Sequence, residues 1–118
     1  MYSPELLDHF EHPRNSGQLA GATARHRIEN PACGDVLELA IKIVDERVED
    51  LRFLAKGCVP AMACASAVTE LAKGKSVAEA RAVSKEDVVR AVGSLPSASG
   101  HAAQLAIDVL QVVLGTQR

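Results

Sequence analysis

Residues 37–56 read LELAIKIVDERVEDLRFLAK. From Leu37 to Ile43 every second residue is a large aliphatic one, and the charged residues Glu38 and Lys42 lie between them. This period of two is typical of a strand with one buried face. After a polar turn at residues 45–47, residues 51–56 alternate in the same way. The segment therefore predicts a hairpin with a single apolar side, which helices must cover.

Before the hairpin, the sequence predicts one helix and a short strand. Ser3 can cap a helix whose first residue is Pro4, and its apolar stripe stops before Pro13, so we expect a helix over roughly residues 4 to 11. A turn-rich stretch follows. We expect a short edge strand around residues 24 to 28.

After the hairpin, the pattern is helical. An alanine-rich helix is expected to start within residues 57–60, with Pro60 in its first turn, and to end at Gly74. Two further short helices begin at Ser76 and Ser84. A last helix is expected from about residue 99 to residue 114. Its inward side chains are expected to be Leu105, Val109, Val112 and Val113.

Composition excludes several classes of protein. The 118 residues suit a single domain, residues 1–118, and aromatic residues are only 3% of the chain. A net charge of -2, without a basic stripe, argues against nucleic acid as a partner. Neither a secretory signal nor an apolar run long enough for a membrane span is present. We expect a soluble, cytoplasmic protein without a membrane partner.

Two of the three cysteines are placed where metal ligands could converge. Cys33 and Asp35 flank Gly34 just before the hairpin, and Cys58 follows the hairpin's second strand. Because the first strand of an antiparallel hairpin begins where the second ends, these side chains should meet at one edge of the sheet. Taken singly, each also fits a plainer role: a turn with a buried thiol, or a small residue that caps a helix.

The remaining candidates carry less weight individually. His101 opens the last helix and could add an imidazole at the same edge, although a lone histidine here is more often exposed or capping. Cys64 lies six residues beyond Cys58, which is about 120° around the helix. We expect Cys64 to be a packed core thiol.

In combination, these residues resemble the N-terminal domain family of IscU and NifU. The resemblance covers nearly the whole chain, and the motifs that carry it are Tyr2-Ser3, Asp8-His9, Pro13-Arg14-Asn15-x-Gly17, Pro31-Ala32-Cys33-Gly34-Asp35, Lys56-Gly57-Cys58 with Ala61, Ala63 and Ser66, Lys73-Gly74-Lys75-Ser76, Leu95-Pro96 and His101.

The resemblance implies an α+β fold, with a three-stranded antiparallel sheet and helices packed on one face and at the ends. It implies a non-enzymatic scaffold that receives sulfur from a cysteine desulfurase and iron from an iron donor. The scaffold binds iron or a 2Fe–2S cluster and passes it to apo acceptor proteins. Cys33, Asp35, Cys58 and His101 match the family's ligand positions, and zinc often occupies this site in isolated members.

Two positions depart from the family. Ala102 stands where a third ligand cysteine normally follows the histidine, and we expect a thiol placed there to be exposed or half-exposed. A ligand from a partner, or from a second copy in a weak homo-oligomer, could complete the site. Residues 95–99 read LPSAS where bacterial members carry the chaperone-binding sequence LPPVK, so chaperone-assisted transfer is not implied.

Two other functions remain open at the level of sequence. A degenerate relative could hold zinc, or no metal, and act as a partner of the desulfurase, since two cysteines, a histidine and an aspartate suit tetrahedral zinc. A thiol redox enzyme is less favoured because the chain has no Cys-x-x-Cys motif.

Overall fold

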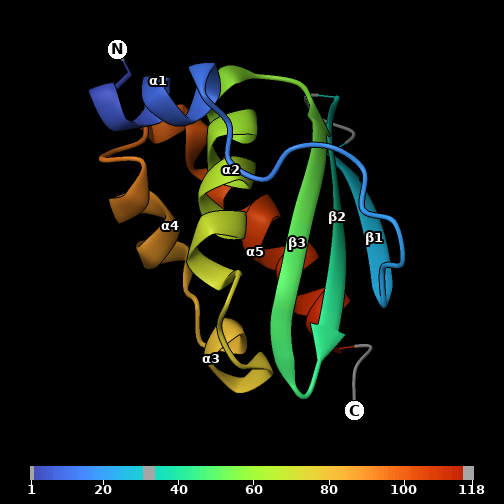
Figure 1. Ribbon diagram of the computed structural model, residues 1–118. Coiled ribbons are helices and arrows are strands. Elements are labelled where there is room, and N and C mark those ends of the chain that lie inside the picture. The colour runs from blue at the N-terminus through green and yellow to red at the C-terminus, as the bar shows by residue number, and fades with distance from the viewer. Residues whose placement is uncertain (1, 31–33, 116–118) are drawn as a thin grey trace.

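The computed structural model describes residues 2–30 and 34–115 and contains one antiparallel sheet. Its strands are β1 (Ala24–Asn30), β2 (Asp35–Val44) and β3 (Arg47–Lys56), in the spatial order β1-β2-β3 (Figure 1). The predicted hairpin and the predicted edge strand are both confirmed, and β1 extends two residues beyond the predicted end. The predicted three-stranded antiparallel sheet is therefore the fold's central element.

The hairpin turns over two residues. Asp45 and Glu46 have φ values of 52° and 61°. Two successive positive φ values are typical of the turn whose twist matches that of paired strands. In β2, the strand that leads into this turn, alternate aliphatic side chains are buried in the core, and Leu39 and Ile41 are 0% exposed.

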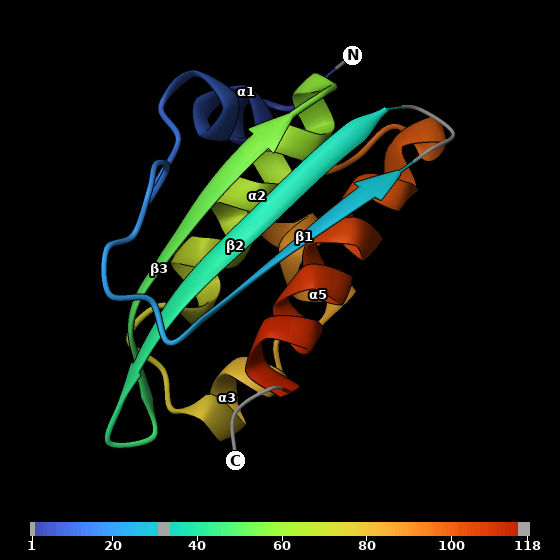
Figure 2. The same cartoon turned by 90° about the vertical axis from the view of Figure 1, so that its right-hand side faces the viewer.

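Helices cover one face of the sheet, as predicted. They are α1 (Pro4–Glu11), α2 (Val59–Ala72), α3 (Val77–Arg81), α4 (Lys85–Ala91) and α5 (Gly100–Gly115), with a 3-10 turn η1 (Ser97–Ser99) before α5. The helix α2 packs against β3, and α5 packs against β1 and β2 (Figure 2). The core lies between the sheet and these two helices.

The helix starts follow from local capping. The Ser3 hydroxyl accepts a hydrogen bond from the Leu6 amide. Ser76 and Ser84 each form a reciprocal capping box with the acidic residue three positions later. The helix α2 begins at Val59, within the predicted start at residues 57–60, and Pro60 lies in its first turn.

One predicted core residue is misplaced. Val112 was expected to point inward, but it is 40% exposed. The buried stripe of α5 passes through Ala106 and Val113, which are both 0% exposed. Each helical residue advances about 100°, so Val112 lies at the margin of that stripe.

No helix within residues 2–30 and 34–115 combines the length and the apolar character needed to cross a membrane.

A buried polar cluster attaches α1 to α2. The His9 ring is 5% exposed, and its Nδ1 lies 2.8 Å from the Ser66 hydroxyl, which also accepts a hydrogen bond from the Arg14 amide. The His9 Nε2 lies 3.7 Å from a Glu70 carboxylate oxygen. Burial, followed by the positive charge of Arg14, lowers the pKa of His9.

This lowered pKa predicts a loss of stability on acidification. As the pH falls through about 6.5, the ordinary histidine pKa, the unfolded chain takes up a proton that the folded His9 resists. We therefore expect the free energy of unfolding to fall between pH 7.5 and pH 5.5, and to fall less in His9→Gln. Urea titrations at both pH values measure this difference, with the exposed His12→Gln as the control. Equal pH dependence in wild type and His9→Gln would contradict it.

Candidate metal centre

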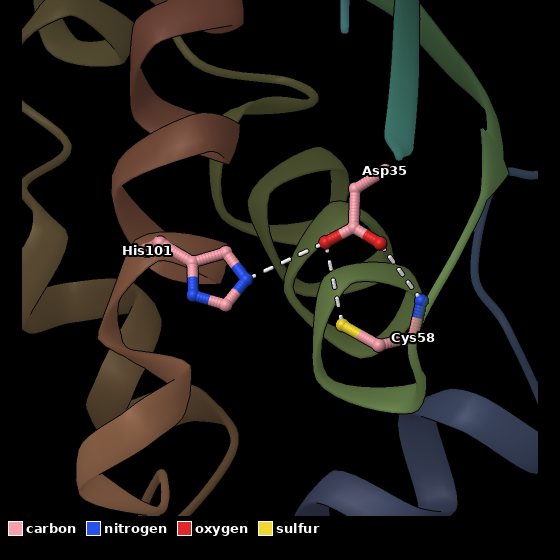
Figure 3. Close-up of side chains that lie close together, drawn as sticks. All are labelled: Asp35, Cys58 and His101. Atoms are coloured by element: carbon pink, nitrogen blue, oxygen red, sulfur yellow. Dashed lines mark hydrogen bonds and ion pairs between the residues drawn. The ribbon is translucent and has the colours of Figure 1, made fainter. Parts of the chain in front are cut away.

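Three elements bring three potential ligands to one edge of the sheet. Asp35 is the first residue of β2, Cys58 is the N-cap of α2, and His101 lies in the first turn of α5. Each offers a donor atom, and these atoms all lie within 4.8 Å of one another (Figure 3). The pairing of Val36 with Lys56 explains the meeting of the first two, since it aligns the start of β2 with the end of β3.

Asp35 is at the centre of this cluster. Although it is 1% exposed, both carboxylate oxygens have partners. Oδ1 accepts a hydrogen bond of 3.0 Å from the Cys58 amide. Oδ2 lies 3.4 Å from the Cys58 Sγ and 3.4 Å from the His101 Nε2. One oxygen is thus held by the backbone, and the other faces the two remaining donors.

Cys58 and His101 connect this buried carboxylate to solvent. Cys58 is exposed, and the His101 side chain is 37% exposed. The Cys58 sulfur also lies at the N-terminus of α2, where the positive end of the helix dipole attracts negative charge. A metal ion or a sulfur donor could therefore reach the cluster from outside.

Cys64 belongs to the core, as expected from its position on the helix. It is 0% exposed, and burial raises the pKa of its thiol to about 12. It is not part of the cluster of Asp35, Cys58 and His101. A protonated, enclosed thiol is a poor metal ligand.

Cys33 lies outside the described residues, so its place as a ligand stays a prediction. Ala102 is 1% exposed, and the expectation of an exposed or half-exposed thiol there is wrong. Its position in the first turn of α5, packed into the core, explains the burial. Burial would also raise the pKa of a thiol placed at residue 102.

The chemistry of the donor set fits a metal ion or an iron–sulfur cluster. The described cluster offers a sulfur, an imidazole nitrogen and a carboxylate oxygen. Thiolate and imidazole are common ligands of zinc and of iron–sulfur iron, and an oxygen ligand is weaker for both. The set therefore suits a labile site better than a permanent one.

The sequence reasoning missed one residue of this site. Gly57 was given no role beyond its place in the motif Lys56-Gly57-Cys58, yet a β-carbon built at this residue would lie 2.0 Å from Asp35 Oδ1. Its position directly before Cys58 was the available signal, since a glycine often allows close approach of the backbone to another group.

Comparisons with known proteins find relatives along nearly the whole chain. The model of the NifU-like N-terminal domain family matches residues 1–116. The iron–sulfur cluster assembly scaffold protein IscU 1 of Archaeoglobus fulgidus is 41% identical over 111 residues, which are 94% of this chain and 72% of the relative. IscU of Escherichia coli is 39% identical over 117 residues, which are 96% of this chain and 91% of the relative.

Solved structures support the fold. A protein of Fervidobacterium islandicum, assigned as an iron–sulfur cluster assembly scaffold for the SUF system, superposes with a TM-score of 0.79 at 17% identity and covers 96% of both chains. The N-terminal part of a NifU-like protein from Brucella abortus gives a TM-score of 0.65 at 20% identity, over 95% of this chain and 79% of that one. At such low identity these likenesses show the fold alone.

Proposed function

Since this chain belongs to the NifU-like N-terminal domain family, we propose that it is a scaffold on which an iron–sulfur cluster is assembled and from which the cluster passes to acceptor proteins. One observation carries the proposal. A thiol, an imidazole and a buried carboxylate from three separate elements converge within 4.8 Å. The names of the relatives support the same function, since they are scaffold proteins for iron–sulfur clusters.

Each residue has a proposed part in holding the cluster. Cys58 supplies a thiolate at the N-terminus of α2, and Cys33 supplies the second thiolate. His101 supplies an imidazole nitrogen. Asp35 supplies one carboxylate oxygen, which is the weakest of the four bonds and the one that exchanges first during transfer. We propose no role for Cys64, which is enclosed in the core.

The proposal implies three kinds of partner. A cysteine desulfurase delivers sulfur, an iron donor delivers iron, and an apo acceptor removes the finished cluster. The exposure of Cys58 supports delivery from a partner, because sulfur transfer between proteins requires an accessible thiol. The protein itself holds and releases the cargo, and no chemical step on a small molecule is assigned to it.

Transfer of a cluster tests the function. The protein is incubated without oxygen with a cysteine desulfurase, cysteine, ferrous iron and a dithiol reductant, which supplies the electrons that reduce the delivered sulfur to sulfide, and is then mixed with an apo ferredoxin. We expect the absorbance of a 2Fe–2S ferredoxin to develop only when the scaffold has been loaded. If the protein takes up zinc but supplies no sulfide to the ferredoxin, the zinc-holding alternative replaces the scaffold.

A further inference from the structure

Gly57 lies between the end of β3 at Lys56 and Cys58, the N-cap of α2. Its φ is +146°, a conformation that residues with side chains rarely adopt. A β-carbon built at this position would lie 2.0 Å from Asp35 Oδ1, 2.8 Å from its Cγ and 3.0 Å from its Cα. The Asp35 carboxylate thus fills the space that any side chain at residue 57 would need.

This close approach determines how the carboxylate is held. With Oδ1 against Gly57, it can accept the 3.0 Å hydrogen bond from the next amide, that of Cys58. The group is then turned so that Oδ2 faces Cys58 Sγ and His101 Nε2, each at 3.4 Å (Figure 3). One oxygen accepts a hydrogen bond from the backbone, and the other faces the two remaining donor side chains of the cluster.

We propose that Gly57 is a positioning residue for the metal centre. Because residue 57 has no side chain, the Asp35 carboxylate can lie against its backbone, an arrangement that we call the seat. The seat orients the carboxylate so that Oδ2 alone is presented as a ligand. The inference rests on the proposed function, because it gives Gly57 a role in the same metal site. A carboxylate that binds through one oxygen holds less tightly than one that binds through both, which suits a site that must release its cargo.

The conformation of the backbone alone does not explain this glycine. Gly74 also has a positive φ, +84°, and a β-carbon built there meets nothing within 4 Å. Alanine at residue 74 would therefore strain the backbone without touching a ligand. Alanine at residue 57 would strain the backbone and also displace Asp35. Comparison of the two substitutions separates the cost of strain from the loss of the seat.

A double-mutant cycle tests the seat through metal affinity. Co²⁺ alone is titrated into wild type, Gly57→Ala, Asp35→Ala and the double variant. We expect Gly57→Ala to weaken Co²⁺ binding about 10- to 100-fold in the wild-type background. With Asp35→Ala already present, it should weaken binding by less than about threefold, because the displaced group is gone. Gly74→Ala should leave the affinity unchanged.

Equal weakening by Gly57→Ala in both backgrounds would overturn the inference, as would no weakening in either. If Gly57→Ala does not fold, the double variant decides. Recovery of folding on removal of the carboxylate supports the clash, and failure of both variants contradicts it.

A metal-free measurement separates this inference from the proposed function. Hydrogen exchange of the Cys58 amide reports its bond to Asp35 without any ligand. We expect exchange to be faster in Gly57→Ala, reaching the rate in Asp35→Ala, and unchanged in Gly74→Ala. Slow exchange in Gly57→Ala refutes the seat whether or not metal binds. If the wild-type protein binds no Co²⁺, the metal site is refuted. The exchange rates of the Cys58 amide would still test whether Gly57 positions the Asp35 carboxylate.

Discussion

Cys58→Ala is expected to weaken binding of Fe²⁺ or Zn²⁺ about 100-fold or more. The substitution removes the sulfur that faces Asp35 and His101, and a zinc site of four ligands supplies roughly 10 to 16 kcal/mol in total. Loss of one thiolate therefore removes a few kcal/mol, and every 1.4 kcal/mol is about a tenfold change in affinity. Competition with a chromophoric chelator under anaerobic conditions measures the change.

Cys64→Ala is the matched control, because it removes a thiol from the same helix at a distance from the cluster. It should leave the metal affinity unchanged, since Cys64 is 0% exposed and stays protonated. Its effect should appear instead as a loss of stability of about 1 kcal/mol from the small cavity in the core. Equal loss of metal in the two variants would show that the site has been assigned to the wrong cysteine.

Asp35→Ala is expected to slow the release of a bound cluster about tenfold. The substitution removes the oxygen ligand, Oδ2, that we take to exchange most readily, together with its negative charge. The rate at which a loaded scaffold converts apo ferredoxin to its holo form measures the effect.

Asp50→Ala provides the control for loss of a carboxylate. Asp50 lies on β3, where its Oδ1 is 3.3 Å from the Lys73 Nζ, and it is not among the clustered ligands. Its removal should leave the transfer rate unchanged. Transfer from Asp35→Ala at the wild-type rate would remove the proposed role of this residue in release.

Local rules predicted most of the fold. Ser3 and Pro4 determine where α1 begins, and its apolar stripe stops before Pro13. All of these signals act within one or two helical turns. The hairpin follows from alternation, because a shift of one residue in register would turn Leu37, Leu39 and Ile41 away from the covered face. The meeting of Asp35 and Cys58 follows from that hairpin alone.

The features that were missed depend on contacts between distant residues. The side chain of His9 is buried because Ser66 lies beside it, 57 positions later in the sequence. Val112 is exposed because the packing of α5 centres the buried stripe on its neighbours. The burial of Ala102 and the seat at Gly57 likewise require the docked position of α5 and the path of β2. Periodicity gives the face of an element, but it does not give the angle at which that face meets another element.

Bound iron and acid-labile sulfide, measured together on protein purified without oxygen, test the central claim most directly. A scaffold that carries a 2Fe–2S cluster should contain iron and sulfide in equal amounts, and both should be lost together in Cys58→Ala. Purified protein that contains zinc without sulfide, or iron and sulfide that persist undiminished in Cys58→Ala, would contradict the assignment of this site as the place where a cluster is held.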